Sequence, residues 1–414
     1  MKKYMMLITL ILMFSFVLHA ENLNVKDVIE MGLENSYDMN IQDYYLRNAK
    51  NDLYSSYLDL LPGVDYSISR TEYSDDTVSE TGQIQISESI SSNDSRYFSI
   101  KNSHNSYKKG KIDYKIVRRE LVFNIINKYI DVLESKENLE LAKQNVKTAQ
   151  LDYDQTQVLK EHGKASRLDL QQSQISLSQA RLDSLKAYDE HINTKIELCH
   201  FINVNYDPEY NFKELSYEFK NPAKIDFTPE QNLSVVSMQQ DIKQSKLSLL
   251  QNTLEFFPTL SFSINKSFDW EETNPLDFND EQPYSFTLQL SYPLINSLIN
   301  YPDNKSYSNN LKVRQLQLEQ TIREKQKEYT FYNTSYQQAK RSLELAKKQI
   351  ELTELHYDLI RQKYDLGEAD LTDLEKARSD LFNSKYNRIN KFYDLIILQE
   401  NINLLTNKKL MGKY

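Results

Sequence analysis

Long heptad-spaced runs without glycine or proline constrain this chain more than any other feature of its sequence. Its seven glycines and nine prolines among 414 residues leave 111–162, 164–207 and 303–366 without any break. Apolar residues in these runs recur at steps of three, four or seven, which is the spacing of a coiled-coil seam. Few breaks imply few elements. The sequence therefore predicts long antiparallel helices.

Two glycines divide the heptad runs into two helical hairpins. Because glycine readily takes the left-handed conformation that ends a helix, we expect turns at Gly163 and Gly367. A helix from Lys111 to His162 would be about 75 to 80 Å long at 1.5 Å per residue. The seam positions in the first hairpin are Val122, Ile125, Tyr129, Val132, Leu139, Ala142, Val146, Ala149, Tyr153, Leu168, Ile175, Leu182, Leu185, Ile192 and Ile196. Those in the second are Tyr336, Ala339, Leu343, Ala346, Ile350, Tyr357, Ile360, Tyr364, Leu374 and Leu381.

Four short stretches alternate apolar and polar residues with a period of two, the pattern of half-buried strands. They read GVDYSIS and QIQISESI in the first half, and TLSFSINKSFDW and YSFTLQLSY in the second. Such strands suit either a sandwich or a membrane barrel. Aromatic residues near the strand ends favour the barrel, namely Tyr66, Trp270, Tyr284 and Tyr292. Since about eight strands are needed to close even a small barrel, four strands predict a homo-oligomer.

The N-terminus has the pattern of a secretory signal peptide, which we place at residues 1–20. Lys2 and Lys3 precede an apolar run from Met5 to Leu18, and Ala20 supplies the small residue of a cleavage site. We therefore expect the mature protein to leave the cytoplasm. Its one cysteine, Cys199, lies far from this segment, so we expect a small core residue and no lipoprotein.

The predicted elements occur twice in the same order: a helix, a proline, two strands, a long helix, a glycine turn and a returning helix. Pro62 and Pro258 precede the strand pairs, and the two prolines lie 196 positions apart, against 204 for the two glycines. The second copy should carry the difference as an insertion, which we place in Asn296 to Lys305.

We expect the two repeats to span 21–227 and 228–414. The first would hold a β-hairpin at about 63–101 and the second a β-hairpin at about 259–293. A coiled-coil hairpin would follow each of them. After each returning helix we expect a mixed equatorial segment, at about 200–227 in the first repeat and from Ile389 to the C-terminus in the second.

Several function classes find no support in the sequence. The net charge of -9 without a basic patch argues against nucleic-acid binding. Cys199 and His200 form one adjacent pair without the further ligands that a zinc site requires, and no nucleophile, phosphate loop or carboxylate pair is evident. We expect no enzyme, no metal site and no cofactor. The acidic stretch Asp277 to Gln282 is read as a solvated loop rather than a cation site.

These features together resemble the TolC family of outer-membrane efflux proteins. The resemblance rests on the signal peptide, the duplicated order, the Leu-Pro before the first strand and a Gly-x-Ala-x-x-x-Asp-Leu turn in both hairpins. The stretch LSYPLIN, Leu290 to Asn296, is similar to the Pro-Leu segment that the family carries before its second long helix. The main alternative is a periplasmic adaptor or a secreted coiled-coil scaffold, and the amphipathic strands count against both.

The resemblance implies a mainly α fold with a small transmembrane β part. Three copies would form one twelve-stranded outer-membrane barrel that continues as an α-helical periplasmic tunnel. Such proteins are passive ducts for efflux or type I secretion. They dock onto a periplasmic adaptor and an inner-membrane pump of ABC, RND or MFS type.

The resemblance also implies roles for residues at the two glycine turns. These would be the periplasmic tips, and the candidates for adaptor contact are His162, Gly163, Lys164, Leu366, Gly367 and Glu368. The candidates for the entrance constriction are Asp169, Asp373, Glu375 and Lys376. Lys376 stands where a second aspartate is expected, which counts against strong cation selectivity. The polar stretch Asp94 to Lys111 would be the first junction between barrel and helix.

Overall fold

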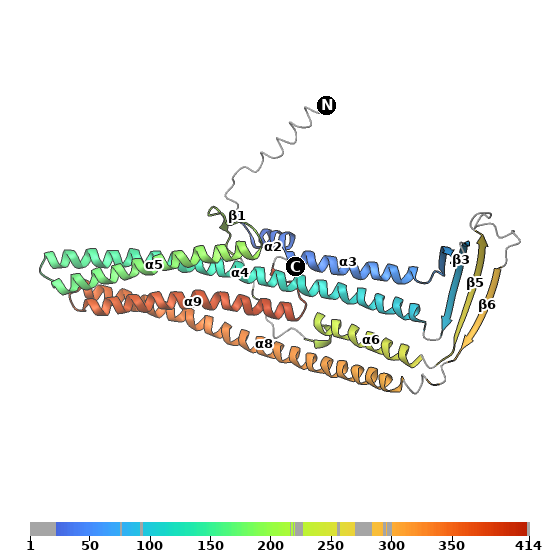
Figure 1. Ribbon diagram of the computed structural model, residues 1–414. Coiled ribbons are helices and arrows are strands. Elements are labelled where there is room, and N and C mark those ends of the chain that lie inside the picture. The colour runs from blue at the N-terminus through green and yellow to red at the C-terminus, as the bar shows by residue number, and fades with distance from the viewer. Residues whose placement is uncertain are drawn as a thin grey trace, which may run out of the picture. The chain divides into compact units, whose positions relative to one another are not determined.

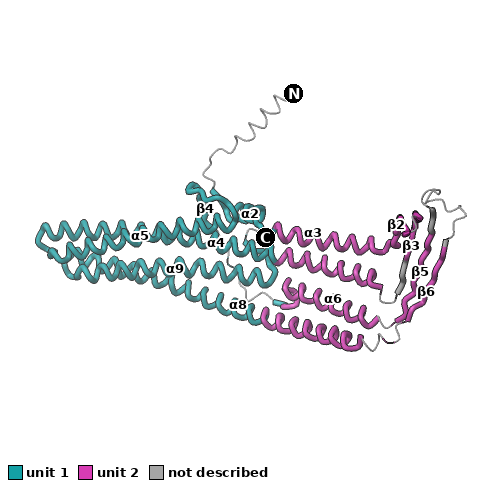
Figure 2. The backbone as a smooth tube through the Cα atoms, in the orientation of Figure 1, with its two compact units in different colours: residues 1–39, 117–228, 326–414 teal, residues 40–116, 229–325 magenta. Residues whose placement is uncertain are grey.

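The structure is a computed structural model of the chain. It describes residues 22–74, 77–91, 94–215, 217, 219, 227–254, 257–269, 284–292, 295 and 300–411. The predicted signal peptide, Trp270 and the acidic stretch 277–282 lie outside these residues. The chain divides into two compact units, which Figure 2 shows in different colours. Unit 1 comprises residues 1–39, 117–228 and 326–414, and unit 2 comprises 40–116 and 229–325.

Unit 1 is built on two antiparallel helical hairpins (Figure 1). The first pairs α4 (Ser95–Glu161) with α5 (Arg167–Phe201), and the second pairs α8 (Tyr301–Leu366) with α9 (Leu371–Leu405). Helices α4 and α8 begin in unit 2 and enter unit 1 at Val117 and Gln326. The expected long helices and their glycine turns are confirmed.

Both hairpins turn through the same hydrogen-bonded glycine motif. Gly163 has φ +71° and Gly367 has φ +78°, which is the left-handed region that glycine favours. The Gly163 N–H donates to Lys160 O at 3.0 Å, and the Lys164 N–H donates to Leu159 O at 2.8 Å. These two bonds satisfy carbonyls that the end of α4 would otherwise leave open, as in a Schellman motif.

The apolar core of unit 1 lies where α4 crosses the short elements near the N-terminus. Strands β1 (Asn22–Leu23) and β4 (Asn211–Phe212) pair in parallel beside α2 (Val25–Asn35). Tyr129 of α4 is fully buried there. Its hydroxyl donates to backbone oxygens, with distances of 2.6 Å to Lys213 O and 3.2 Å to Leu23 O. Residues of α9 pack on the same core, which joins the second hairpin to the first.

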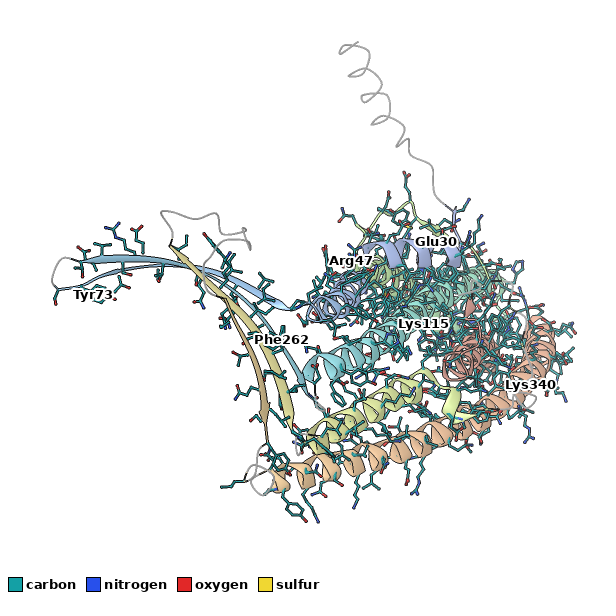
Figure 3. The ribbon with its side chains drawn as sticks, turned by 90° about the vertical axis from the view of Figure 1, so that its right-hand side faces the viewer. Glu30, Arg47, Tyr73, Lys115, Phe262 and Lys340 are labelled. Atoms are coloured by element: carbon teal, nitrogen blue, oxygen red, sulfur yellow. The ribbon has the colours of Figure 1, made fainter. Side chains whose placement is uncertain are left out.

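Unit 2 contains one four-stranded antiparallel sheet and the helices next to it in sequence. The strands β2 (Gly63–Glu72), β3 (Val78–Ser91), β5 (Thr259–Asp269) and β6 (Tyr284–Ser291) follow the order β2-β3-β5-β6. Figure 3 shows Tyr73 at the far end of the sheet and Phe262 along β5. Helix α3 (Tyr37–Leu58) leads into β2, and α6 (Leu233–Leu254), after the short η2 (Pro229–Gln231), leads into β5.

The register separates an apolar face of the sheet from a polar face. Val64 pairs with Ile86, which pairs with Ile264, which pairs with Phe286. In the next row of residues the partners are Asp65, Gln85, Asn265 and Ser285. The expected period of two is therefore confirmed in the four strands.

The start of α4 corrects one expectation. Asp94 to Lys111 was expected to form a junction, but α4 begins at Ser95 and includes these residues. The Asp94 carboxylate accepts from the Arg96 N–H at 2.9 Å, which caps the helix, and Phe98 is buried. Gly110 does not break the helix, and it packs against Leu46 and Ala49 of α3. The β-hairpin accordingly ends at Ser91 rather than near residue 101.

Two further boundaries differ from the expected ones. Helix α8 begins at Tyr301, so the last five residues of the expected insertion are helical, and Pro302 stands in the first turn where its missing N–H costs little. Part of the insertion is in place, since nine residues separate β6 from α8 and three separate β3 from α4. Helix α9 continues to Leu405 because Ile396 and Ile402 remain buried, so the segment after it is shorter than expected.

Among the described residues, no helix combines the length and the apolar character needed to cross a membrane.

Candidate functional site

The tip of the first hairpin is exposed and carries an excess of basic groups. His162, Lys164 and Arg167 are exposed around Gly163, and the His162 ring nitrogen Nδ1 lies 2.8 Å from Val158 O. Asp169, a predicted entrance residue, also caps a helix. Its carboxylate accepts from the Ser166 N–H at 2.7 Å, and Ser166 Oγ accepts from the Asp169 N–H at 3.1 Å. This capping box fixes the start of α5.

The tip of the second hairpin is exposed and acidic. Leu366 is 75% exposed, and Gly367 and Glu368 are exposed beside it. Asp370, at the N-cap of α9, makes no side-chain capping bond. Asp373 and Lys376 point to solvent, whereas Glu375 is half-buried and accepts from Gln172 Nε2 of α5 at 3.1 Å.

Hydrogen bonds bring the two tips together within unit 1. Gln155 of α4 donates to Asp365 of α8, and Gln172 of α5 donates to Glu375 of α9. The predicted tip and entrance residues therefore lie at one end of unit 1. Their roles in adaptor contact and in the constriction stay predictions.

A buried ion pair joins the two hairpins a few turns from the tips. Asp152 of α4 is 3% exposed and lies 3.7 Å from Arg378 Nη1 of α9, which is also buried. Arg378 donates in addition to Ser176 Oγ of α5. Burial raises the pKa of the Asp152 carboxyl, and the nearby charges of Arg378 and Arg361 oppose this shift. One arginine thus holds three helices together.

Two tyrosines of α8 extend this polar seam. Tyr364 and Thr156 of α4 share a hydrogen bond of 2.9 Å between their hydroxyls. Tyr357 packs near Asp152, and burial raises its pKa to about 12. Sequence reasoning placed both tyrosines in an apolar seam but missed Asp152, Thr156 and Arg378. The seam spacing could have identified these three residues, because each lies three or four positions from a predicted seam residue.

A second cluster of charges lies between α4 and α9 nearer the core of unit 1. Glu137 accepts from the Tyr393 hydroxyl at 2.8 Å and lies 3.4 Å from Arg388 Nη1. Burial, followed by repulsion from Asp394, Asp131 and Glu137, raises the pKa of Glu134 to about 7. The contact between the hairpins therefore contains a carboxyl group that titrates near neutrality.

No group of His, Cys, Asp and Glu in the described part of the chain could hold a metal ion. Cys199 is buried, as expected of a core residue, while His200 beside it is exposed.

Comparisons with known proteins agree with this architecture. The chain is similar in structure to the CmeC outer membrane channel of Campylobacter jejuni, with a TM-score of 0.79 and 16% identity over 94% of this chain and 86% of that one. For VceC of Vibrio cholerae the TM-score is 0.81 at 12% identity, covering 93% and 96%. For the open state of the MtrE channel of Neisseria gonorrhoeae it is 0.76 at 13% identity, covering 94% and 90%.

Sequence comparison supplies the family. No curated protein matches the chain in sequence. The family described as outer membrane efflux protein matches residues 28–203 and 228–408, which is most of the chain and one stretch in each half. The matched stretches include all four coiled-coil helices and both tips. The chain therefore belongs to the outer membrane efflux protein family.

Proposed function

We propose that three copies of this chain assemble into a passive duct that crosses the outer membrane and extends into the periplasm. The family assigns the chain to outer-membrane efflux. The trimer, the passive mechanism and the docking of the tips are the parts that we propose.

The observation that carries the proposal is a pair of exposed leucine-rich stripes on α5 and α8. On α5, Leu168, Ile175, Leu182 and Ile196 follow a heptad spacing but are exposed, so the prediction that they form the seam of the first hairpin is wrong. At about 100° per residue they lie opposite Leu177 and Ala180, which pack on α4. On α8 the stripe consists of Leu345, Leu352, Leu359 and Leu366, which are 51% to 75% exposed.

Such stripes need a partner, because water-exposed heptads of leucine are coiled-coil seams. The α5 and α8 stripes belong to different hairpins, so the α5 stripe of one copy can pack on the α8 stripe of the next. A contact between two different surfaces is heterologous, and such contacts form a closed ring when the rotation permits.

The sheet supports the same arrangement. In the described part of the chain β2 and β6 are the edge strands of the sheet, and β6 of one copy can pair with β2 of the next. Val64, Phe286, Leu288 and Leu290 on the apolar face are exposed, which fits contact with lipid. The ion pair Arg70–Glu80, at 3.0 Å, lies just beyond Ile68 and marks the end of this apolar face. Four strands from each of three copies give the twelve-stranded barrel that the family resemblance implies.

Channels of this family work with a periplasmic adaptor and an inner-membrane pump. We place the adaptor at the exposed tips around Gly163 and Gly367, and the energy source in the pump, which would be of the ABC, RND or MFS class.

The first test measures the protein mass of the detergent-solubilised particle from the outer-membrane fraction by light scattering. A mass near three chains supports the duct. A monomer in the soluble periplasm would contradict it and would favour the adaptor or scaffold alternative.

A second test addresses the tips. Gly367→Pro or Asp373→Lys should reduce export or adaptor assembly while the amount of trimer in the outer membrane stays unchanged. Loss of the folded trimer in both variants would show that these positions are structural instead.

A further inference from the structure

A cavity in unit 1 lies away from the tips, beside the C-terminal half of α5. It has a volume of about 750 Å³ and opens between α4, α5 and the segment that follows α5. Helix α4 contributes Lys136, Glu140 and Lys143, and α5 contributes His191 and Lys195. Tyr206 and Pro208 close one side, and the volume suits a small ligand.

Three ammonium groups line this cavity, and two of them have no carboxylate partner. Lys143 pairs with Glu140 at 2.8 Å. Lys195 is only 6% exposed, and its Nζ donates to Pro208 O at 3.0 Å. Lys136 Nζ reaches only neutral oxygens, Asn211 Oδ1 and Phe212 O, each at 3.4 Å. Among the described residues, no carboxylate oxygen lies within 4 Å of the Nζ of Lys136 or Lys195.

At His191 the nearby positive charges outweigh the negative ones. Burial lowers the pKa of Lys195. Burial and then repulsion by Lys195, Lys136 and Lys143 lower the pKa of His191 to about 4, so its imidazole is neutral at pH 7. Its Nδ1 lies 3.0 Å from Ser135 Oγ. A buried ammonium group without a counter-charge is costly, because burial removes its hydration without replacing it by an ion pair.

We propose that this cavity binds an oxyanion, a phosphate or carboxylate group that pairs with Lys136 and Lys195. The other titratable groups that face His191 do not form an ion pair with Lys136 or Lys195, so both ammonium groups can pair with a bound anion. Glu140 pairs with Lys143, and Asp189 and Tyr188 are exposed at the rim. Asp207 forms no ion pair with Lys195, and its charge offsets only part of the effect of burial on the pKa of Lys195. All of the residues that line the site belong to unit 1.

The test is titration calorimetry on the full-length protein purified from the outer membrane, with inorganic phosphate and, separately, with citrate. Wild-type protein should bind at least one of them, and the one that binds identifies the ligand class. Lys195→Met should weaken binding by about 30-fold or more, as expected when one partner of a buried charge pair is removed. Lys186→Met on the same helix is the matched control, because Lys186 is 76% exposed and lies 3.7 Å from Asp183. It should leave binding unchanged.

Two further measurements test whether a loss of anion binding comes from the site itself and not from unfolding or from the net charge of the protein. Without anion, Lys195→Met should unfold at the same temperature as the wild type or higher, because it removes an unpaired buried charge. Anion binding should be coupled to proton uptake by His191 below neutral pH, and His191→Gln should remove the uptake but keep the binding. The proposal is overturned if the wild type binds neither anion, if Lys195→Met binds as the wild type does, or if Lys186→Met weakens binding equally.

Discussion

Charged residues at seam positions control how firmly the two hairpins of unit 1 hold together. Most of the seam is apolar, and its residues could be exchanged for others of similar volume at modest cost. Arg378 and Asp152 differ, because each is buried and each depends on the other for its charge balance. A change at either residue therefore acts on three helices at once.

Arg378→Met should destabilise the protein by about 3 to 5 kcal/mol at neutral pH, because it removes the larger of the two cationic charges that act on the buried Asp152 carboxylate. Thermal unfolding followed by circular dichroism measures the effect. The double variant Asp152→Asn/Arg378→Met removes both charges and should recover much of the loss. If the double variant is as unstable as the single one, the pairing is not the cause.

Glu134→Gln should change the pH dependence of stability. The pKa of Glu134 in the folded protein is about 7, above its ordinary value of 4.5, so the folded state favours the protonated form. Its contribution is fully present below about pH 4.5 and is lost as pH rises through 7. The variant should therefore be more stable than the wild type at pH 8 and equal to it at pH 4. A constant difference in unfolding temperature across this range would contradict the assignment.

At the level of helices and strands, the sequence predicted the elements that depend on a local residue pattern. Heptad spacing identified the four long helices, and Gly163 and Gly367 identified their turns, because only a left-handed residue can close them. Alternation identified the strands. The start of α4 was missed because Asp94 to Lys111 is polar, whereas helix continuation there depends on Phe98 being buried and on α3 packing against Gly110. The link between Asp152 and Arg378 was missed because it joins residues more than 200 positions apart.

Two glycines should respond differently to alanine. Gly367→Ala places a Cβ in open space. Its only expected effect is the strain of an alanine in the left-handed conformation, which lowers the free energy of unfolding by about 1 kcal/mol. Gly32→Ala places a Cβ 2.5 Å from Ile125 Cδ1 and 3.0 Å from Ile202 Cγ2 in the core, and should cost about 1 to 3 kcal/mol by overpacking. Unfolding temperatures compare the two. A larger loss from Gly367→Ala would mean that the tip, not the core, limits stability.

At the scale of the whole molecule, the α8 stripe gives a direct test of assembly. Leu352→Gln/Leu359→Gln should shift the detergent-solubilised protein from trimer to monomer, because it removes apolar contact from a seam that lies open in the single chain. Lys340→Gln/Lys347→Gln is the matched control, with two exposed residues at the same spacing on the same helix. Light scattering reports the mass. A trimer that persists in the leucine variant would exclude this stripe from the interface.

The open edges of the sheet have a consequence for the life of the chain before assembly. Among the described residues, β2 and β6 are the edge strands of the sheet, and an edge strand can pair with an extended segment of another chain. Edge pairing with a wrong partner is the first step towards an aggregate. Capture by a sister copy must therefore outpace capture by unrelated unfolded chains, and crowding of the periplasm with other nascent barrel proteins should lower the yield. Assembly of this protein is therefore a kinetic competition, decided by how quickly newly exported copies of the chain meet.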